Sequence, residues 1–174
     1  MKRLIVGISG ASGVSLGKRF IDHLPKDIEV YTIVSDHAKV VFEREENIFE
    51  LDDADIGACS ASGSFQNDGM VIIPCSMNSL AKIAHGIADN LLTRTASVMI
   101  KERRPLLLAP REMPFSPIAL ENMYKLSMIG TIIAPPIPGY YANPDSLEAM
   151  EDFMIGKWFD LLGIKHDLYE RWKG

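Results

Sequence analysis

Short runs of apolar residues alternate along the chain with longer segments in which apolar residues recur every three or four positions. The short runs have strand length and β-branched content, and they predict strands at Leu4–Ile8, Ile28–Val34, Met70–Cys75, Pro105–Ala109 and Thr131–Ala134. The longer segments predict helices at Val14–Leu24, His37–Glu46, Ser79–Arg103 with a break near Gly86, Pro117–Met128 and about Asp145–Leu162. Strands that are almost entirely apolar are typical of parallel sheets covered on both faces. The pattern predicts an α/β fold, a doubly wound and mostly parallel sheet with helices on both faces, in one domain over residues 1–174.

Composition narrows the class of protein. Of the 174 residues, 47% are apolar and 24% are charged, so the chain can bury a core without disulfide bonds. Its 18 basic and 23 acidic residues include no basic block, so we expect no nucleic-acid partner. Two cysteines without Cys/His clustering predict no metal site. Apolar runs fall far short of the roughly 20 residues of a spanning helix, and we expect a cytoplasmic protein with no membrane partner.

Small residues follow the first predicted strand in the run Gly7-Ile-Ser9-Gly10-Ala-Ser12-Gly13, and a helix comes next. Backbone N–H groups at such a helix start suit an anion. The glycine spacing differs from that of dinucleotide-binding turns, and Gly17-Lys18 lacks the rest of an ATP-binding loop. A tight turn that needs glycine for its geometry alone is the alternative. The hydroxyls of Ser9 and Ser12 favour a ligand.

A second small polar cluster, Ser76-Met-Asn-Ser79, follows the third predicted strand, and Ser35 ends the second. The carboxyl ends of parallel strands share one edge of a sheet, so these residues are expected to lie together with the glycine turn. Helix capping is the alternative for the cluster. Cys75 has no fixed histidine beside it, which disfavours a nucleophilic role. Residues Asn47–Asp68 predict a long irregular loop of the kind that often carries function.

The segment from Arg94 to Glu112 is the densest in charge. Arg94 and Lys101 are seven positions apart, so one face of a helix can present both cations. Arg111 and Glu112 follow a buried strand, at the edge where ligands bind in such sheets. Cations near that edge of an acidic chain favour a phosphorylated small molecule as ligand. For Glu102, Arg103 and Arg104 a solvated helix flank is the preferred interpretation.

Two aromatic segments and one helix boundary complete the pattern. Tyr141 follows a proline-rich run and either closes a pocket or packs against the turn. The end of the chain, Tyr169-Glu-Arg-Trp172, is either an anchor to a neighbouring subunit or a lid. Asn143-Pro-Asp145, with Glu148 three residues later, predicts a capped helix start, and Gly163 predicts the end of that helix.

Several motifs, taken in order, resemble those of the UbiX/Pad1 flavin prenyltransferases. They are Ser9-Gly-Ala-Ser12-Gly, Pro74-Cys-Ser76, Asp89-Asn90-Leu-Leu, Lys101-Glu-Arg-Arg-Pro, Pro110-Arg111-Glu112-Met-Pro-Phe, Leu120-Glu-Asn-Met123 and Pro138-Gly-Tyr-Tyr141. The resemblance covers essentially the whole chain, and the run from Lys101 to Met123 is highly specific. It implies a Rossmann-like flavin-binding domain over residues 1–174, with a C-terminal helix and tail, that works without a metal.

The resemblance also implies the activity and the partners. Such enzymes join the dimethylallyl group of dimethylallyl monophosphate to N5 and C6 of reduced FMN. The prenylated FMN serves UbiD-type decarboxylases, often in ubiquinone biosynthesis or aromatic acid decarboxylation. The family likeness further implies a homo-oligomer, a dodecamer with sites between subunits.

Roles for individual residues follow from motif positions in this resemblance. FMN contacts are implied for Gly10, Ala11, Ser12, Ser35, Ser76, Met77, Asn78, Ser79 and Arg111. Contacts to the prenyl phosphate are implied for Arg94, Lys101, Tyr141 and Lys157, and roles in the chemistry or the pocket shape for Ser12, Glu45, Glu112 and Trp172. Cations would stabilise the departing phosphate, while an aromatic, water-poor cavity suits the allylic cation. Two departures stand out: Lys157 where arginine is common, and Ser76-Met-Asn-Ser79 in place of a smaller Ser-Thr-Gly-Thr turn.

Two other functions remain open at this level. A flavin-dependent cysteine decarboxylase shares the fold and the flavin site, and His37 after Ser35 would suit its catalytic histidine, although the block from Lys101 to Glu112 favours prenyl transfer. A flavin-binding protein without turnover is the second. A nucleotide-dependent transferase is disfavoured because the ATP-binding loop is missing.

Overall fold

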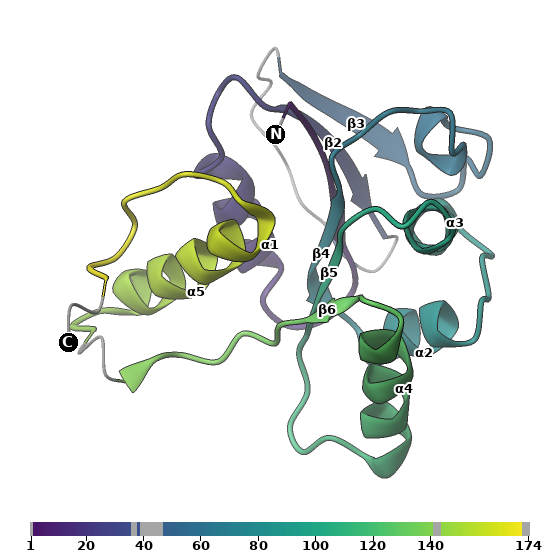
Figure 1. Ribbon diagram of the computed structural model, residues 1–174. Helices are drawn as coiled ribbons and strands as arrows, with labels where there is room; N and C mark the ends of the chain where they lie inside the picture. Colours follow the sequence, from purple (N-terminus) through teal and green to yellow (C-terminus); the bar gives the residue numbers. More distant parts are fainter. Residues whose placement is uncertain (1, 36–37, 39–46, 141–143, 172–174) are drawn as a thin grey trace. The chain divides into compact units, whose positions relative to one another are not determined.

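The computed structural model of the chain describes residues 2–35, 38, 47–140 and 144–171 (Figure 1). It contains two compact units, which we call the sheet unit (Lys2–Pro135) and the C-terminal unit (Pro136–Gly174). The sheet unit holds β1 (Arg3–Ile8), α1 (Val14–Asp22), β2 (Glu29–Val34), β3 (Ile48–Asp52), η1 (Cys59–Ala61), β4 (Met70–Cys75), α2 (Met77–Ala84), α3 (Leu91–Lys101), β5 (Leu106–Pro110), α4 (Pro117–Met128) and β6 (Ile132–Ile133). The C-terminal unit holds α5 (Leu147–Leu162).

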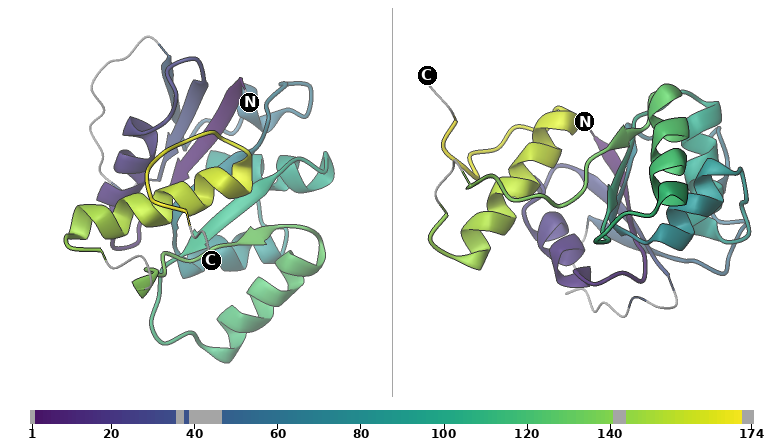
Figure 2. Two further views of the ribbon diagram at one scale, coloured as in Figure 1. Left: turned by 60° about the vertical axis from the view of Figure 1, so that its left-hand side comes forward. Right: turned by 90° about the horizontal axis from the view of Figure 1, so that it is seen from below.

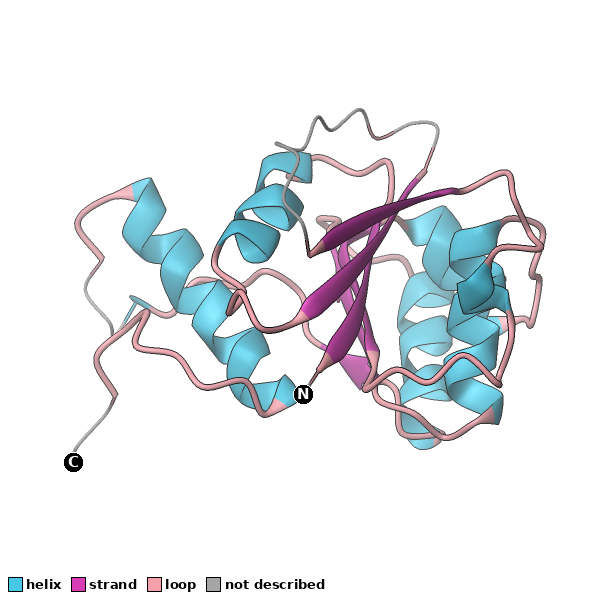
Figure 3. Ribbon diagram, turned by 90° about the horizontal axis from the view of Figure 1, so that it is seen from above, coloured by secondary structure: helices cyan, strands magenta, loops and turns pink. Residues whose placement is uncertain are grey.

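The strands of the sheet unit form one parallel sheet in the order β3-β2-β1-β4-β5-β6, seen as a twisted layer in Figure 3. Within the sheet unit, α1 covers one face and α2, α3 and α4 cover the other (Figure 2). This arrangement confirms the predicted doubly wound α/β fold. Chain order reverses between β1 and β4, and in such sheets a ligand crevice opens at the carboxyl ends of the strands on either side of that reversal.

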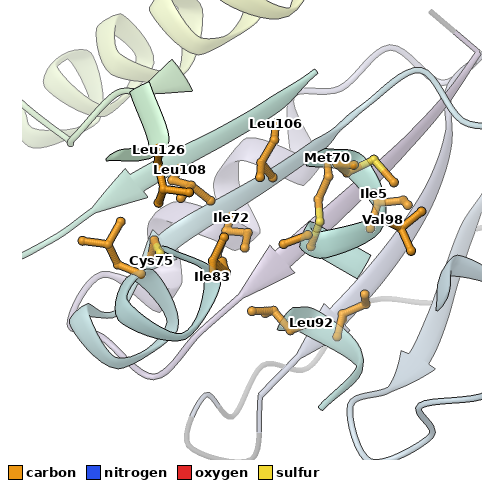
Figure 4. Packing of buried hydrophobic residues seen from close by; sticks show 14 of the residues in the cluster. Ile5, Met70, Ile72, Cys75, Ile83, Leu92, Val98, Leu106, Leu108 and Leu126 are labelled. Carbon is orange, nitrogen blue, oxygen red and sulfur yellow. The ribbon is translucent and has the colours of Figure 1, made fainter. Parts of the chain in front are cut away.

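Burial of the central strands explains why they form. Every residue of β4 and β5 is buried, as is β1 from Leu4 onward. Side chains of α2, α3 and α4, among them Ile83, Leu92 and Leu126, face those of the strands in one apolar cluster (Figure 4). On the opposite face α1 approaches β4 closely: a Cβ added to Gly17 would lie 2.2 Å from the carbonyl oxygen of Ile73. The sheet is therefore covered on both sides, which leaves its strand ends for a ligand.

Polar residues at the helix starts set the boundaries that matter for the site. The Ser76 hydroxyl accepts a hydrogen bond from the Ser79 backbone N–H (3.2 Å) and starts α2. Asn90 and Thr93 form a reciprocal capping box at the start of α3. Gly86, with φ of 70°, separates the two helices, so the break predicted within Ser79–Arg103 is confirmed.

The segment 47–68 is more ordered than the sequence predicts. It contains the strand β3 and one turn of 3-10 helix, η1, where we expected an irregular loop. The strand was missed because, among the described strands, it lies at the sheet edge beside β2 and leaves its acidic side chains exposed. Phe49 gives it one apolar anchor by stacking on Tyr31, with ring centroids 4.9 Å apart. The predicted helix His37–Glu46 lies outside the described residues, apart from Ala38.

Within the C-terminal unit, α5 begins at Leu147, two residues later than predicted, because the Ser146 hydroxyl accepts a hydrogen bond from the Ala149 N–H (3.1 Å). Gly163 ends the helix with φ of 70°, as predicted. Across the described part of the chain, every helix is too short or too polar to span a bilayer. The prediction of one domain over residues 1–174 stays a prediction.

Candidate functional site

A cavity of about 290 Å³ opens where the ends of β1, β2, β3 and β4 meet the first turns of α2 and α3. This volume lies near the lower limit of small-molecule pockets, which is roughly 300 Å³. It occupies the crevice beside the reversal of strand order. Its lining residues are Gly10, Ser35, Asp53, Ser76, Asn78, Ser79, Lys82, Asn90 and Thr93.

Ser9 fixes the walls of this cavity instead of facing a ligand. Its side chain is buried, donates a hydrogen bond to the Pro74 carbonyl (3.0 Å) and accepts one from the Ser76 backbone N–H (2.7 Å). Its one donor and one of its two acceptor positions are used within the protein. The hydroxyl of Ser9 therefore does not support the ligand interpretation drawn from the sequence, whereas Ser12 is exposed.

The glycine turn leaves the start of α1 open to an anion. Gly13 precedes the helix with φ of 100°, a conformation that favours glycine. No side chain caps α1 and no acidic residue stands in its first turn. Backbone N–H groups at an uncapped helix start carry partial positive charge. The turn from Gly10 to Gly13 can therefore hold a phosphate.

The first turn of α2 contributes hydroxyl and amide groups to the cavity. Ser76, Asn78 and Ser79 line it, and the Ser76 and Ser79 hydroxyl oxygens lie 3.1 Å apart. Ser76 also caps the helix, so the capping interpretation is confirmed for this residue. Met77 begins α2 and is not among the lining residues. This wall offers neutral hydrogen-bonding groups to a ligand.

Four lining residues were not predicted from the sequence: Asp53, Lys82, Asn90 and Thr93. Asp53, 6% exposed, follows β3 and ties it to α3, because its carboxylate accepts hydrogen bonds from Asn90 Nδ2 (2.8 Å) and the Leu92 N–H (2.9 Å). Predicting β3 as a loop hid this position. The capping pattern at Asn90 was the available signal, since a helix starting at the reversal faces the crevice.

Lys82 is the one cation among the lining residues of this cavity. Its ammonium group lies 2.7 Å from the Asp89 carboxylate. The hydrogen bond from Lys82 lowers the pKa of Asp89 below its usual value. The cavity therefore carries a positive group on the α2 side that is partly balanced by the neighbouring carboxylate.

The two predicted cations of α3 lie at opposite ends of that helix. Arg94 is exposed and follows the lining residue Thr93, whereas Lys101 is the last residue of α3. Seven residues of helix correspond to about 10 Å along its axis. Lys101 instead pairs with Glu102. Of these two cations, Arg94 alone adjoins a residue that lines the cavity in the described part of one copy of the chain.

The other predicted site residues are distributed more widely. Arg111 and Glu112 follow β5 with exposed side chains and do not line the cavity, although the Arg111 backbone N–H donates to the Cys75 carbonyl (3.2 Å). Ala11 adjoins the lining residue Gly10. Lys157 is exposed on α5 in the C-terminal unit. Glu45, Tyr141 and Trp172 lie outside the described residues, as does His37.

Two expectations about reactive and charged groups have clear outcomes. Cys75 is fully buried, and burial raises the pKa of its thiol to about 12, which agrees with the expectation that it is not a nucleophile. Arg104 does not belong to a solvated flank, because its guanidinium donates to the carbonyls of Phe65 (2.7 Å) and Gly63 (2.6 Å). These two hydrogen bonds hold the loop that precedes β4 against the end of α3.

Comparison with known proteins places the chain among flavoproteins. The Flavoprotein family model matches residues 1–157. The flavin prenyltransferase UbiX of Helicobacter pylori is 52% identical over 183 aligned positions, covering 98% of each chain. The crystal structure of AnUbiX (PadA1) in complex with FMN and dimethylallyl pyrophosphate has a TM-score of 0.93 and 36% identity, over 99% of this chain and 98% of that one. A dodecameric FMN-dependent UbiX-like decarboxylase from Escherichia coli O157:H7 has a TM-score of 0.92 and 37% identity, over 99% and 100%.

Proposed function

The chain belongs to the UbiX flavin prenyltransferase family of flavoproteins, and we propose on this basis that it transfers a dimethylallyl group from dimethylallyl monophosphate to N5 and C6 of reduced FMN. The observation that carries the proposal is the cavity at the strand reversal, which combines anion-binding and neutral polar groups in a chain 52% identical to a flavin prenyltransferase. The prenylated FMN would then serve a UbiD-type decarboxylase.

The residues of the cavity fit FMN. Five of the residues predicted to contact it line one cavity: Gly10, Ser35, Ser76, Asn78 and Ser79. The uncapped start of α1 suits the phosphate of the flavin nucleotide, and the hydroxyl and amide groups of α2 suit its neutral polar atoms. Bound FMN supplies the nucleophilic ring atoms of the reaction. Ala11, Ser12, Met77 and Arg111 complete the proposed FMN contacts.

The second substrate needs cations for its phosphate. We assign this role to Arg94 and Lys157 together with Lys101, because a departing phosphate is stabilised by positive charge in a site that excludes water. Tyr141 and Trp172 would shelter the allylic group, and Glu45 would shape the pocket. Ser12 and Glu112 are the proposed proton carriers, one toward the phosphate and the other from C6 of the flavin.

The distance between Arg94 and Lys101 along α3 supports an active site that is shared between copies of the chain. Because Lys101 lies at the end of α3 remote from the cavity, we assign its contribution to a neighbouring copy of the chain. The surface of α4 fits such contacts: Leu120, Tyr124 and Met128, spaced four residues apart, are 54%, 64% and 68% exposed. We therefore propose a homo-oligomer, as in the dodecameric relative. The cytoplasmic location stays a prediction.

Mass spectrometry of the flavin tests the proposed function. Purified protein is incubated without oxygen with reduced FMN and dimethylallyl monophosphate, and in parallel with the pyrophosphate. The expected product is a flavin heavier by one C5H8 unit. An unchanged flavin mass with both prenyl donors would contradict the proposal.

Two variants separate prenyl transfer from flavin storage. Arg94→Ala and Glu112→Gln should retain FMN while product formation falls, because both side chains are exposed and neither lines the cavity. The matched controls are Arg103→Ala and Glu121→Gln, which are also exposed. A protein that only stores flavin would be indifferent to all four changes. A cysteine decarboxylase would instead release CO2 from a peptide with a C-terminal cysteine.

A further inference from the structure

Lys82 occupies the face of α2 that is turned to the cavity. Asn78 and Ser79 lie four and three positions before it on this helix, so the three residues share one face, and all three line the cavity. The two earlier residues offer neutral polar groups. Lys82 adds a full positive charge to the same wall.

The cavity has two charged lining residues, Asp53 and Lys82. The carboxylate of Asp53 is already engaged, because it accepts hydrogen bonds from Asn90 Nδ2 (2.8 Å) and the Leu92 N–H (2.9 Å). A phosphate monoester carries a charge of about −1.5 to −2 at pH 7, and burying that charge is costly unless a cation accompanies it. Of the residues that line this cavity, Lys82 is the one that can supply a full positive charge.

The ion pair between Lys82 and Asp89 has its cationic member on the cavity side. The ammonium nitrogen lies 2.7 Å from the carboxylate, and the side chains are 28% and 51% exposed, respectively. Lys82 lines the cavity, whereas Asp89 does not. Ion pairs with this much exposure contribute little to stability, because water solvates both partners well. A phosphate in the cavity can therefore replace the Asp89 carboxylate as the partner of Lys82.

The flavin phosphate suits Lys82 better than the prenyl phosphate does. Five of the residues proposed to contact FMN line the same cavity as Lys82. Of the described residues assigned to the prenyl phosphate, which are Arg94, Lys101 and Lys157, none lines it. Gly10 connects the cavity with the uncapped start of α1. Backbone N–H groups there carry partial positive charge, and an ammonium group would complete the charge balance for a phosphate.

We propose that Lys82 binds the phosphate of FMN, and that it exchanges its partner Asp89 for this phosphate when the flavin nucleotide enters. The inference rests on the proposed function for the identity of the ligand. Asp89 then competes with the ligand for the same ammonium group. Removing the lysine and removing the carboxylate should have opposite effects on FMN affinity, whereas an ion pair that only ties α2 to the segment before α3 would give the same effect for both.

Titration of the flavin-free protein with FMN and, separately, with riboflavin tests the role of Lys82. Riboflavin lacks the phosphate and keeps the ring and the ribityl chain. In Lys82→Gln the dissociation constant of FMN should rise about tenfold to a hundredfold, which is the range for a hydrogen bond to a charged group. That of riboflavin should stay within about twofold of the parent. Lys82→Arg keeps the positive charge and should restore most of the FMN affinity.

Asp89→Asn tests the exchange of partners. This variant keeps Lys82 and removes its competitor, so FMN should bind more tightly, by up to about fivefold, the range for an exposed ion pair. The matched control is the pair Lys18 and Asp22 on α1, which lie 2.8 Å apart, are 38% and 48% exposed, and do not line the cavity. Lys18→Gln and Asp22→Asn should leave both dissociation constants unchanged.

The possible outcomes separate this proposal from its alternatives. Equal weakening of FMN and riboflavin by Lys82→Gln and Asp89→Asn would make the pair a structural tie and overturn the proposal. A higher KM for dimethylallyl monophosphate in Lys82→Gln, with unchanged FMN affinity, would assign the lysine to the prenyl phosphate and also overturn it. Should Lys82→Gln fold poorly, Asp89→Asn decides, because it retains the lysine.

Failure of the proposed function is recognised independently. If the parent binds FMN and makes no prenylated FMN, prenyl transfer is contradicted, while the titrations need no turnover and still decide the role of Lys82. If the parent is active and Lys82→Gln binds FMN as tightly as the parent, the function stands and the inference about Lys82 is wrong.

Discussion

Ser9 and Ser76 lie 2.7 Å apart, hydroxyl oxygen to backbone nitrogen, and this hydrogen bond joins the ends of β1 and β4 at the point where the order of the strands reverses. The Ser9 hydroxyl completes the link by donating to the Pro74 carbonyl. Two walls of the cavity are thereby held by one side chain that no ligand needs to touch.

Ser9→Ala should therefore lower both stability and flavin affinity. The change leaves the partly buried Ser76 N–H without its partner, a loss of about 1 kcal/mol in the free energy of unfolding. Urea denaturation measures this value, and FMN titration measures the affinity. Ser97→Ala on α3, half-buried, is the control and should change stability by no more than about 0.5 kcal/mol. Equal stability of the two variants would refute the role given to Ser9.

Asp53→Ala should weaken FMN binding. The buried carboxylate ties the end of β3 to the start of α3, so its removal frees Asn90, which lines the cavity. Hydrogen bonds to a charged group contribute about 1.5–3 kcal/mol, and a loss of 1.4 kcal/mol corresponds to about tenfold in affinity. Fluorescence titration with FMN gives the dissociation constant. Asp27→Ala, an exposed acid, should bind FMN as the parent does.

The two cysteines should differ in reactivity. Cys59 is exposed, whereas burial raises the pKa of the Cys75 thiol to about 12. Because the thiolate is the reactive form, a disulfide reagent at pH 8 should label Cys59 alone in the native protein and both residues after denaturation. Mass spectrometry of the labelled protein counts the modified thiols. Rapid labelling of Cys75 in the native state would be incompatible with its burial.

Acid should loosen the C-terminal unit through Asp160. The hydrogen bond from Arg171 is the main cause that lowers the pKa of Asp160 from its ordinary 3.8. A carboxyl with a depressed folded-state pKa stabilises the fold above pH 3.8, and this contribution is lost as the pH falls from there toward the folded-state pKa. Trp158 fluorescence on α5 should follow the loss below about pH 4. Asp160→Asn should show a weaker acid dependence in that range and lower stability at pH 7.

The central strands and most helices could be predicted because each is encoded locally. Runs such as Met70–Cys75 are apolar over a strand length, and Gly86 and Gly163 end helices through backbone conformations that glycine adopts easily. The edge strand β3 could not be predicted in this way. It is held by pairing with β2, a segment distant in sequence, and its exposed acidic residues resemble those of a loop.

The residues of the candidate site also fall into two groups, those that a local sequence pattern predicts and those that depend on the tertiary structure. The glycine turn, Ser35 and the Ser76–Ser79 turn were predictable, because each stands at the end of a strand whose place in a parallel sheet follows from sequence pattern. Asp53 and Lys82 were not, since their places depend on β3 and on a helix face rather than on a motif. For Ser9 the sequence predicted a ligand contact that the structure does not support. Its hydroxyl belongs to the predicted motif, but it forms hydrogen bonds to the backbone of Pro74 and Ser76.

By itself, the sequence determined the α/β class, the order of elements, the family and the residues that can carry charge to a phosphate. Only the tertiary structure decided which of those groups meet. It separated Lys101 from Arg94 along α3 and brought residues 166–171 back onto α5 around Asp160. The physical reason is that secondary structure follows from neighbours in sequence, whereas a binding site depends on hydrogen bonds and packing between distant segments, which no local pattern specifies.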